Sequence, residues 1–228
     1  MDGWVPRGSQ MMHRWQQTIG VACLAVGLGL GGAEARTFDV EIESSGLATL
    51  DISLVFDFID GGPPANTVTL GPIASSDGTQ SASSASGAVT GSDPGPWVFS
   101  DTDFFNSLVI PFNPLGTSIS FSFTTTDGPA EAGSSPDAFS FSLLDAAGAP
   151  LPTTDPFQSG ALFIVSIGAP DGLSVFTLAG YEANEFAIRV TPAVEPVPEP
   201  ATFALVATAM LLMAMRRRHR ATTLRLHR

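Results

Sequence analysis

The stretch "TSISFSFTTT", residues 117–126, alternates strictly between apolar and hydroxyl-bearing side chains from Ser118 to Thr124. Ile119, Phe121 and Phe123 fall on one side of an extended chain, and the serines between them fall on the other. Because successive side chains of a β-strand point to opposite faces of the sheet, this pattern predicts a strand with one buried face and one wet face. The stretch therefore indicates a β-sheet protein.

Similar runs recur from Thr37 to Thr191, separated by clusters of Gly, Pro, Asp, Asn and Ser that are typical of turns. No segment of this region shows a 3.6-residue apolar period long enough for an amphipathic helix. We expect strands at residues 37–43, 47–59, 66–73, 97–100, 106–112, 117–126, 138–145, 161–167, 173–179 and 185–191. In 138–145, the inward side chains are expected to be Phe139, Phe141 and Leu143. Ten strands at this spacing predict an all-β fold, namely an antiparallel β-sandwich or jelly-roll-like single domain over residues 36–192.

The span 75–96 and the aromatic composition give two further expectations. Residues 75–96 are rich in Ser, Ala and Gly, and predict a long flexible connection with one weak strand near 86–90. The chain holds 16 Phe and one Tyr, which indicates aromatic filling of the core. Trp97, near Phe99, Phe104 and Phe105, is expected in the core, and a sugar-stacking platform is the alternative.

The distribution of charge excludes several classes of function. Residues 36–200 contain 20 acidic residues and only two basic ones, Arg36 and Arg189. This balance argues against nucleic acid as a partner, because phosphate binding needs a basic face. The same span has no Lys, His or Cys, so Ser-His and Cys-His nucleophiles, Schiff-base chemistry and ordinary zinc sites lack their residues. Carboxylates remain, and a pair of them could hydrolyse a glycosidic bond. We expect no catalysis.

Acidic side chains gather in turns rich in Gly and Pro, where Ca²⁺ commonly finds oxygen ligands. No turn has the spacing of an EF-hand, and Asp also serves to cap turns and to keep a protein soluble. The candidate ligands are Asp57 and Asp60 in "DFIDGGPPAN", and Asp101 and Asp103 in "SDPGPWVFSDTDFFN". A third turn of this kind contains Asp127, Glu131 and Asp137. Ca²⁺ is thus the one cofactor that the sequence suggests.

The N-terminal segment, residues 1–35, has the features of a signal peptide. Arg14 precedes an apolar run at residues 19–30, and Ala33 and Ala35 form the small-residue pattern that signal peptidase recognises. We expect export through the Sec machinery and cleavage after Ala35, with an uncleaved anchor as the alternative. A translation start at Met11 or Met12 is an alternative, since residues 1–10 do not fit the pattern of a segment ahead of a signal peptide. Cys23, the single Cys, lies in the apolar run, so the mature protein would have no disulfide.

The C-terminus carries a second apolar segment. A Pro-rich linker, residues 193–200, leads into residues 201–215, which contain no charged residue and would form a helix about 22 Å long, short against a hydrocarbon core of about 30 Å. A basic tail, residues 216–228, follows, and it includes Arg216, Arg217, Arg218 and Arg220. Since positively charged flanks remain in the cytoplasm, we expect a short transmembrane helix with the acidic body outside the membrane.

The segment "VPEPATFALVATAMLLMAMRRR", with Pro198, Glu199 and Pro200 ahead of a short helix and an arginine cluster, resembles the PEP-CTERM sorting signal of Gram-negative bacteria. The resemblance covers roughly the last 30 residues, and the extension "HRATTLRLHR" is longer than such signals usually carry. It implies recognition by exosortase, a membrane transpeptidase, and removal of the helix and arginines. The precursor would be tethered to the inner membrane, and the product would reach the cell surface or extracellular polysaccharide.

Two hypotheses about the body follow. The first is an exported, non-catalytic β-sandwich with a structural or adhesive role in extracellular polysaccharide or biofilm, a role inherited from the family. The alternative is a secreted protein that binds carbohydrate or hydrolyses glycans with a carboxylate pair.

Overall fold

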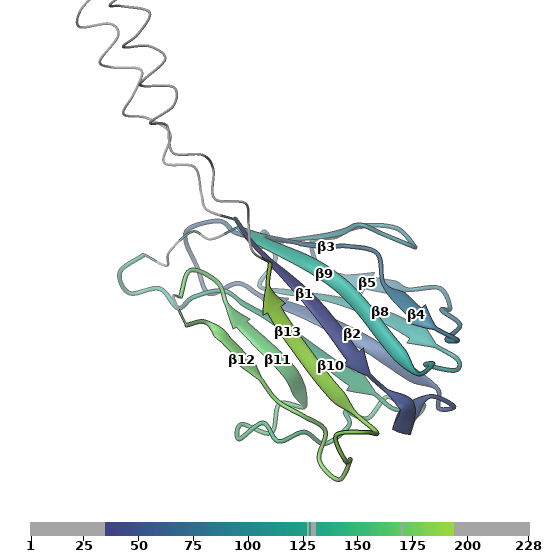
Figure 1. The fold of residues 1–228 in the computed structure, drawn as a ribbon. Coiled ribbons are helices and arrows are strands. Elements are labelled where there is room, and N and C mark those ends of the chain that lie inside the picture. Colours follow the sequence, from purple (N-terminus) through teal and green to yellow (C-terminus); the bar gives the residue numbers. More distant parts are fainter. Residues whose placement is uncertain (1–34, 127, 129–130, 170, 194–228) are drawn as a thin grey trace, which may run out of the picture. The chain divides into compact units, whose positions relative to one another are not determined.

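The computed structural model describes residues 35–126, 128, 131–169 and 171–193. These residues form thirteen β-strands, paired antiparallel where their register is defined, and one short 3-10 helix, η1 (Ser45–Leu47). The all-β, antiparallel class expected from the sequence is confirmed. Figure 1 shows the strands arranged in two layers.

The first layer, sheet A, has the strand order β13-β1-β9-β3-β7-β6, with β4 also paired to β9. Its central pair joins β1 and β9 over nine residues, from Ala35 opposite Thr126 to Glu43 opposite Ser118. The strands are β1 (Ala35–Glu43), β3 (Thr67–Leu70), β4 (Ala74–Ser76), β6 (Val89–Gly91), β7 (Trp97–Ser100), β9 (Ser118–Thr126) and β13 (Ala187–Pro192).

The second layer, sheet B, has the order β12-β11-β10-β2-β8-β5. Strand β2 lies at its centre, with Ile59 opposite both Ala138 of β10 and Phe105 of β8. The strands are β2 (Ile52–Ile59), β5 (Ser84–Ser86), β8 (Phe105–Phe112), β10 (Ala138–Leu144), β11 (Ala161–Ser166) and β12 (Leu173–Val175).

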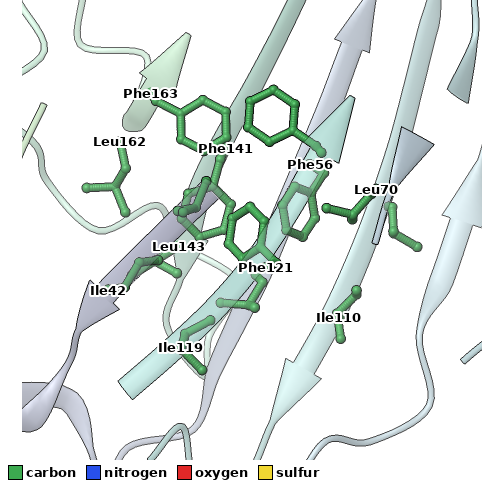
Figure 2. Close-up of a cluster of buried hydrophobic side chains, with 14 of the residues drawn as sticks. Ile42, Phe56, Leu70, Ile110, Ile119, Phe121, Phe141, Leu143, Leu162 and Phe163 are labelled. Atoms are coloured by element: carbon green, nitrogen blue, oxygen red, sulfur yellow. The ribbon is translucent and has the colours of Figure 1, made fainter. Parts of the chain in front are cut away.

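Both sheets direct alternate side chains into one hydrophobic core, which is rich in phenylalanine (Figure 2). Phe121 of sheet A meets Phe56 of sheet B edge to face, with ring centroids 5.2 Å apart, and Phe123 stacks on Phe163 at 5.3 Å. Offset and edge-to-face rings are the favoured aromatic geometries. The inward residues expected in 117–126 and 138–145 are all buried, which confirms that assignment.

Most strands lie where the sequence predicts them, and 47–59 differs most. Only residues 52–59 of this span form a strand, because the chain passes between the sheets at residues 44–51. Leu47 is fully buried within η1, so the apolar pattern continues although the strand does not. Strands β3 and β12 also end earlier than expected, at Leu70 and Val175.

The span 75–96 is not the long flexible connection that its composition predicts. It contains two short strands, β5 and β6, and the end of a third, β4. The Asp93 carboxylate accepts hydrogen bonds from the Gln80 amide at 2.7 Å and the Ser83 hydroxyl at 2.8 Å. Side-chain hydrogen bonds and pairing to the sheets thus order a segment that lacks the apolar alternation of a strand.

The two arginines of the body lie on neighbouring strands of sheet A, Arg36 on β1 and Arg189 on β13. Arg36 donates a hydrogen bond to the carbonyl of Ala169 at 3.0 Å. Within the described ranges, no helix is long and apolar enough to span a membrane. The expected signal peptide up to Glu34 and the expected helix at 201–215 lie outside those ranges.

Candidate functional site

Three of the acidic turns meet at one end of the two sheets. Asp60 directly follows β2, Asp101 directly follows β7, and Asp137 directly precedes β10. Their carboxylates each offer an oxygen within 4.8 Å of the others. We refer to Asp60, Asp101 and Asp137 as the acidic cluster.

Asn66, a buried residue ahead of β3, ties the acidic cluster together. Its backbone N–H donates to Asp101 Oδ2 at 2.7 Å, and its side-chain Nδ2 donates to Asp137 Oδ2 at 2.9 Å. Its own Oδ1 accepts from the Thr126 hydroxyl at 3.1 Å. Two carboxylates are therefore held in place by one side chain and its backbone.

The turn after β2 completes the site. Gly61 N–H donates to Asp137 Oδ1 at 2.7 Å, and Gly62 N–H donates to Asp60 Oδ1 at 2.7 Å. A Cβ at Gly61 would lie 2.3 Å from the carbonyl oxygen of Ser135, so only glycine allows this approach of the two loops.

The cluster places like charges close together in a poorly solvated position. Asp137 is buried, and this burial raises its pKa above the ordinary value for aspartate. Hydrogen bonds from Gly61 and Asn66 oppose the rise, while the nearby charges of Asp60 and Asp101 add to it. Oxygen ligands and uncompensated negative charge are what a hard divalent cation such as Ca²⁺ requires. The acidic cluster can therefore hold such an ion.

The four candidate ligands predicted from the sequence separate into two groups. Asp60 and Asp101 belong to the acidic cluster, whereas Asp57 and Asp103 do not. Asp57 lies within β2 and faces outward between Ser107 and Ser140, because strand alternation places it on the face opposite to the buried Phe56 and Phe58. Asp103 is exposed, and its backbone carbonyl accepts from the Asn106 amide at 2.8 Å.

The sequence identifies Asp137 as one acid of a third turn, but it does not predict that Asp137 lies near Asp60 and Asp101. The signal that could have found it is position, since each member of the acidic cluster adjoins the end of a predicted strand. Which strand ends lie together depends on the sheet order, and a single sequence does not reveal that order.

The aromatic residues near Trp97 also separate. Trp97 and Phe99 are buried in the core, as expected, whereas Phe104 is 73% exposed and Phe105 is 49% exposed. The alternative interpretation, a sugar-stacking platform formed by all four rings, is therefore wrong. Phe104 lies in the loop after Asp101, and Phe105 is the first residue of β8.

A second place with paired acids is an open hollow of about 510 Å³ on the outer face of sheet A. Glu41 and Glu43 of β1 line it, together with Arg189 of β13 and Ser118 and Ser120 of β9. Both glutamates are exposed, whereas a general acid is ordinarily enclosed in a cleft. The hollow suits contact with a polar ligand better than it suits hydrolysis.

Of the residues expected to direct export and sorting, only Ala35 lies in the described part of the chain. It is the first residue of β1, opposite Thr126. The remaining ones, which are Ala33, Pro198, Glu199, Pro200, Arg216, Arg217, Arg218 and Arg220, lie outside it.

Calcium is expected to raise the melting temperature of the purified chain. A ligand present at about 100 times its dissociation constant adds about 2.7 kcal/mol to the unfolding free energy, which is about 5–10 °C for a domain of this size. Asp60→Asn keeps an oxygen for the Gly62 N–H but removes one charge, so it should reduce this gain strongly. Differential scanning calorimetry with Ca²⁺ and with chelator measures it.

The matched control is Asp103→Asn, which changes a neighbouring exposed aspartate outside the acidic cluster. It should respond to Ca²⁺ like the unaltered chain. Equal responses of the two variants, or no response of the unaltered chain, would contradict binding at the acidic cluster.

Stability in chelator should also depend on pH. Burial raises the pKa of Asp57 as well as that of Asp137, so the folded state holds these protons more tightly than the unfolded state. The unfolding free energy should therefore be higher near pH 4.5 than near pH 7, and it should fall as pH rises through the raised values. Hydrogen bonding from Ser159 lowers the pKa of Asp155 instead. This shift makes the unfolding free energy fall with decreasing pH, but only below about pH 4. Urea unfolding at several pH values measures the trend, and a rise in stability toward neutral pH would contradict it.

Comparisons of the chain with protein-family models, with curated proteins and with solved structures find no match.

Proposed function

We propose that this protein is an exported, non-catalytic structural protein whose C-terminal segment is read and removed by an exosortase in a Gram-negative bacterium. The product is delivered to the cell surface or the extracellular matrix. There the acidic body contributes a structural or adhesive role in polysaccharide or biofilm.

The observation that carries this proposal is the order of parts along the chain. A signal-like segment precedes the body, and "VPEP", a short apolar run and an arginine cluster follow it. Between these segments lies a two-sheet body without Lys, His or Cys, which leaves most enzyme mechanisms without residues. This combination favours a protein that is addressed and displayed rather than one that catalyses.

The finer fold class is part of the proposal. Strand β10 lies beside β2 in sheet B, and β9 lies beside β3 in sheet A, so strands distant in sequence become neighbours. Greek-key crossings of this kind support a single jelly-roll-like β-sandwich over residues 36–192.

Calcium is the proposed cofactor, with Asp60, Asp101 and Asp137 as ligands. The close approach of their carboxylates supports this assignment. Bridging of the acidic body to acidic polysaccharide by divalent cations would follow from the same chemistry.

Mass spectrometry of the C-terminal peptide tests the sorting proposal in cells with and without the exosortase. We expect the peptide to end near Pro200 when the enzyme is present and at Arg228 when it is deleted. A chain that ends at Arg228 in both strains would remove the sorting proposal and leave a permanently tethered protein.

A second candidate is binding of carbohydrate by the body. The hollow lined by Glu41, Glu43 and Arg189 favours it, because carboxylates, a guanidinium and serine hydroxyls can all bond to sugar hydroxyls. A glycan array with the purified protein tests binding, and release of reducing sugar from extracellular polysaccharide would reveal hydrolysis.

A further inference from the structure

The outer faces of the two sheets differ in charge. In sheet A, β1 exposes Asp39, Glu41 and Glu43, and β13 exposes Arg189. The six strands of sheet B contain a single charged residue, Asp57. Residues 36–192 contain 18 acidic residues, so sheet B, with one charged side chain, is depleted of charge.

The two outer faces also differ in their apolar content. The outward side chains of β9 and β3 in sheet A are Ser and Thr alone. On sheet B, β2, β8 and β11 direct a set of larger apolar side chains outward. This set consists of Ile59, Phe105, Val109 and Ile164, and Val55 lies among them but is largely covered, at 7% exposure. We call the set, together with the serines between its members, the sheet B face.

The apolar residues of the sheet B face are neighbours across the strands. Ile59 of β2 is directly opposite Phe105 of β8, and both are exposed, at 37% and 49%. Val55 is opposite Val109 in the same strand pair. Depletion of charge with retention of aromatic and aliphatic side chains is the compositional signature of an interface core.

We propose that the sheet B face binds the sheet B face of a second copy of this chain, giving a two-fold symmetric dimer. A basic partner would find acidic side chains to pair with on β1 instead. An identical molecule carries the same excess of negative charge, so two copies approach most closely where acidic side chains are fewest, and Asp57 is the one acid on this face. Two-fold contact of one face with itself is also the commonest arrangement of homo-oligomers.

The size of the face sets the strength of the contact. Strands about 4.8 Å apart and residues rising about 3.3 Å give roughly 500 Å² for the four long strands, or about 1,000 Å² for both copies. This is the lower limit for a specific interface, so the dimer is weak and concentration-dependent. The inference does not depend on sorting of the tail.

Asp57 makes the dimer sensitive to pH. Its carboxyl lies at the centre of the face and accepts a hydrogen bond from Ser107, while among the described residues its Oδ1 has no partner. Neither β8 nor β10, the strands on either side of it, contains a titratable side chain. Burial already raises its pKa, and a second copy laid over it would remove more water. Protonation therefore favours association.

Light scattering coupled to size exclusion tests the proposal on the full chain in a mild non-ionic detergent, over a concentration series. We expect the protein mass to double at high concentration and the dimer fraction to rise in about 0.5 M NaCl, because salt screens the repulsion between copies. The fraction should also rise as pH is lowered. Asp57→Asn should associate at least as tightly at neutral pH and should lose the pH dependence.

Ser140→Glu places a charge on the sheet B face and should give a monomer. The matched control, Thr69→Glu, places the same charge on the outer face of β3 in sheet A, away from the hollow, and should dimerise like the unaltered chain. Circular dichroism checks that both variants fold. A monomer under all conditions, association that survives Ser140→Glu, or equal loss in both variants overturns the proposal. Binding of a neutral glucan that Ser140→Glu abolishes, by a chain that stays monomeric, would assign the face to a glycan and overturn it too.

Discussion

Replacing Pro198, Glu199 and Pro200 together by alanine should leave the chain unprocessed, with its C-terminus at Arg228 and the protein in the membrane fraction. The reason is chemical, because two prolines fix the backbone in an extended form that a protease or transpeptidase can read, and the glutamate between them adds one charge. Alanine removes both features and would let the helix expected at 201–215 continue toward the body. The effect should be close to all-or-none. Immunoblotting of membrane and medium fractions, with mass spectrometry of the C-terminal peptide, measures it.

The chain supplies a matched control for this experiment. Glu195 and Pro196 have the same residue types a few positions earlier, outside the motif. Replacing both by alanine should leave processing unchanged. Normal processing of the triple variant would show that Pro198, Glu199 and Pro200 are not the address.

Replacing Phe56 by alanine should destabilise the body by about 3–5 kcal/mol, because a large ring is lost from a closed core. Phe56 is fully buried and contacts the rings of Phe121, Phe139 and Phe141, at centroid distances of 5.2, 6.2 and 5.0 Å. Truncation removes ring contacts within sheet B and one contact between the sheets (Figure 2). The expected loss corresponds to a fall in melting temperature of about 10 °C. Urea unfolding followed by circular dichroism measures the change.

Phe104→Ala provides the comparison for Phe56, because its ring is 73% exposed. It should change the unfolding free energy by less than about 0.5 kcal/mol. Similar losses in the two variants would mean that the aromatic core does not carry the stability of the fold.

The strands could be read from the sequence wherever alternation was strong. Phe121 and Phe139 are buried where their strands predict, because a period of two leaves only one face to bury. The spans 47–51 and 75–96 could not be read in the same way. In 47–51, an apolar pattern continues through the crossing between sheets, and in 75–96 the strands are held by pairing and by Asp93 rather than by buried side chains.

Only part of the candidate site could be predicted from the sequence. The sequence identified Asp60 and Asp101 as turn residues with suitable chemistry, but it also proposed Asp57 and Asp103. The structure joins the first two with Asp137, because the ends of β2, β7 and β10 meet at one end of the sheets. Proximity of residues so far apart in sequence depends on strand order, and strand order leaves no local mark on a single sequence.

The positions of Arg36 and Arg189 affect the resistance of the folded body to proteolysis. Trypsin-like proteases cut after Arg or Lys, and between residues 36 and 193 the chain offers them only these two positions. Both lie within β1 and β13, neighbouring strands of sheet A, so cleavage requires local opening of that sheet. Cutting at both sites would still leave residues 37–189 as one continuous piece that holds nearly the whole core. The folded body should therefore resist digestion by this class of secreted protease.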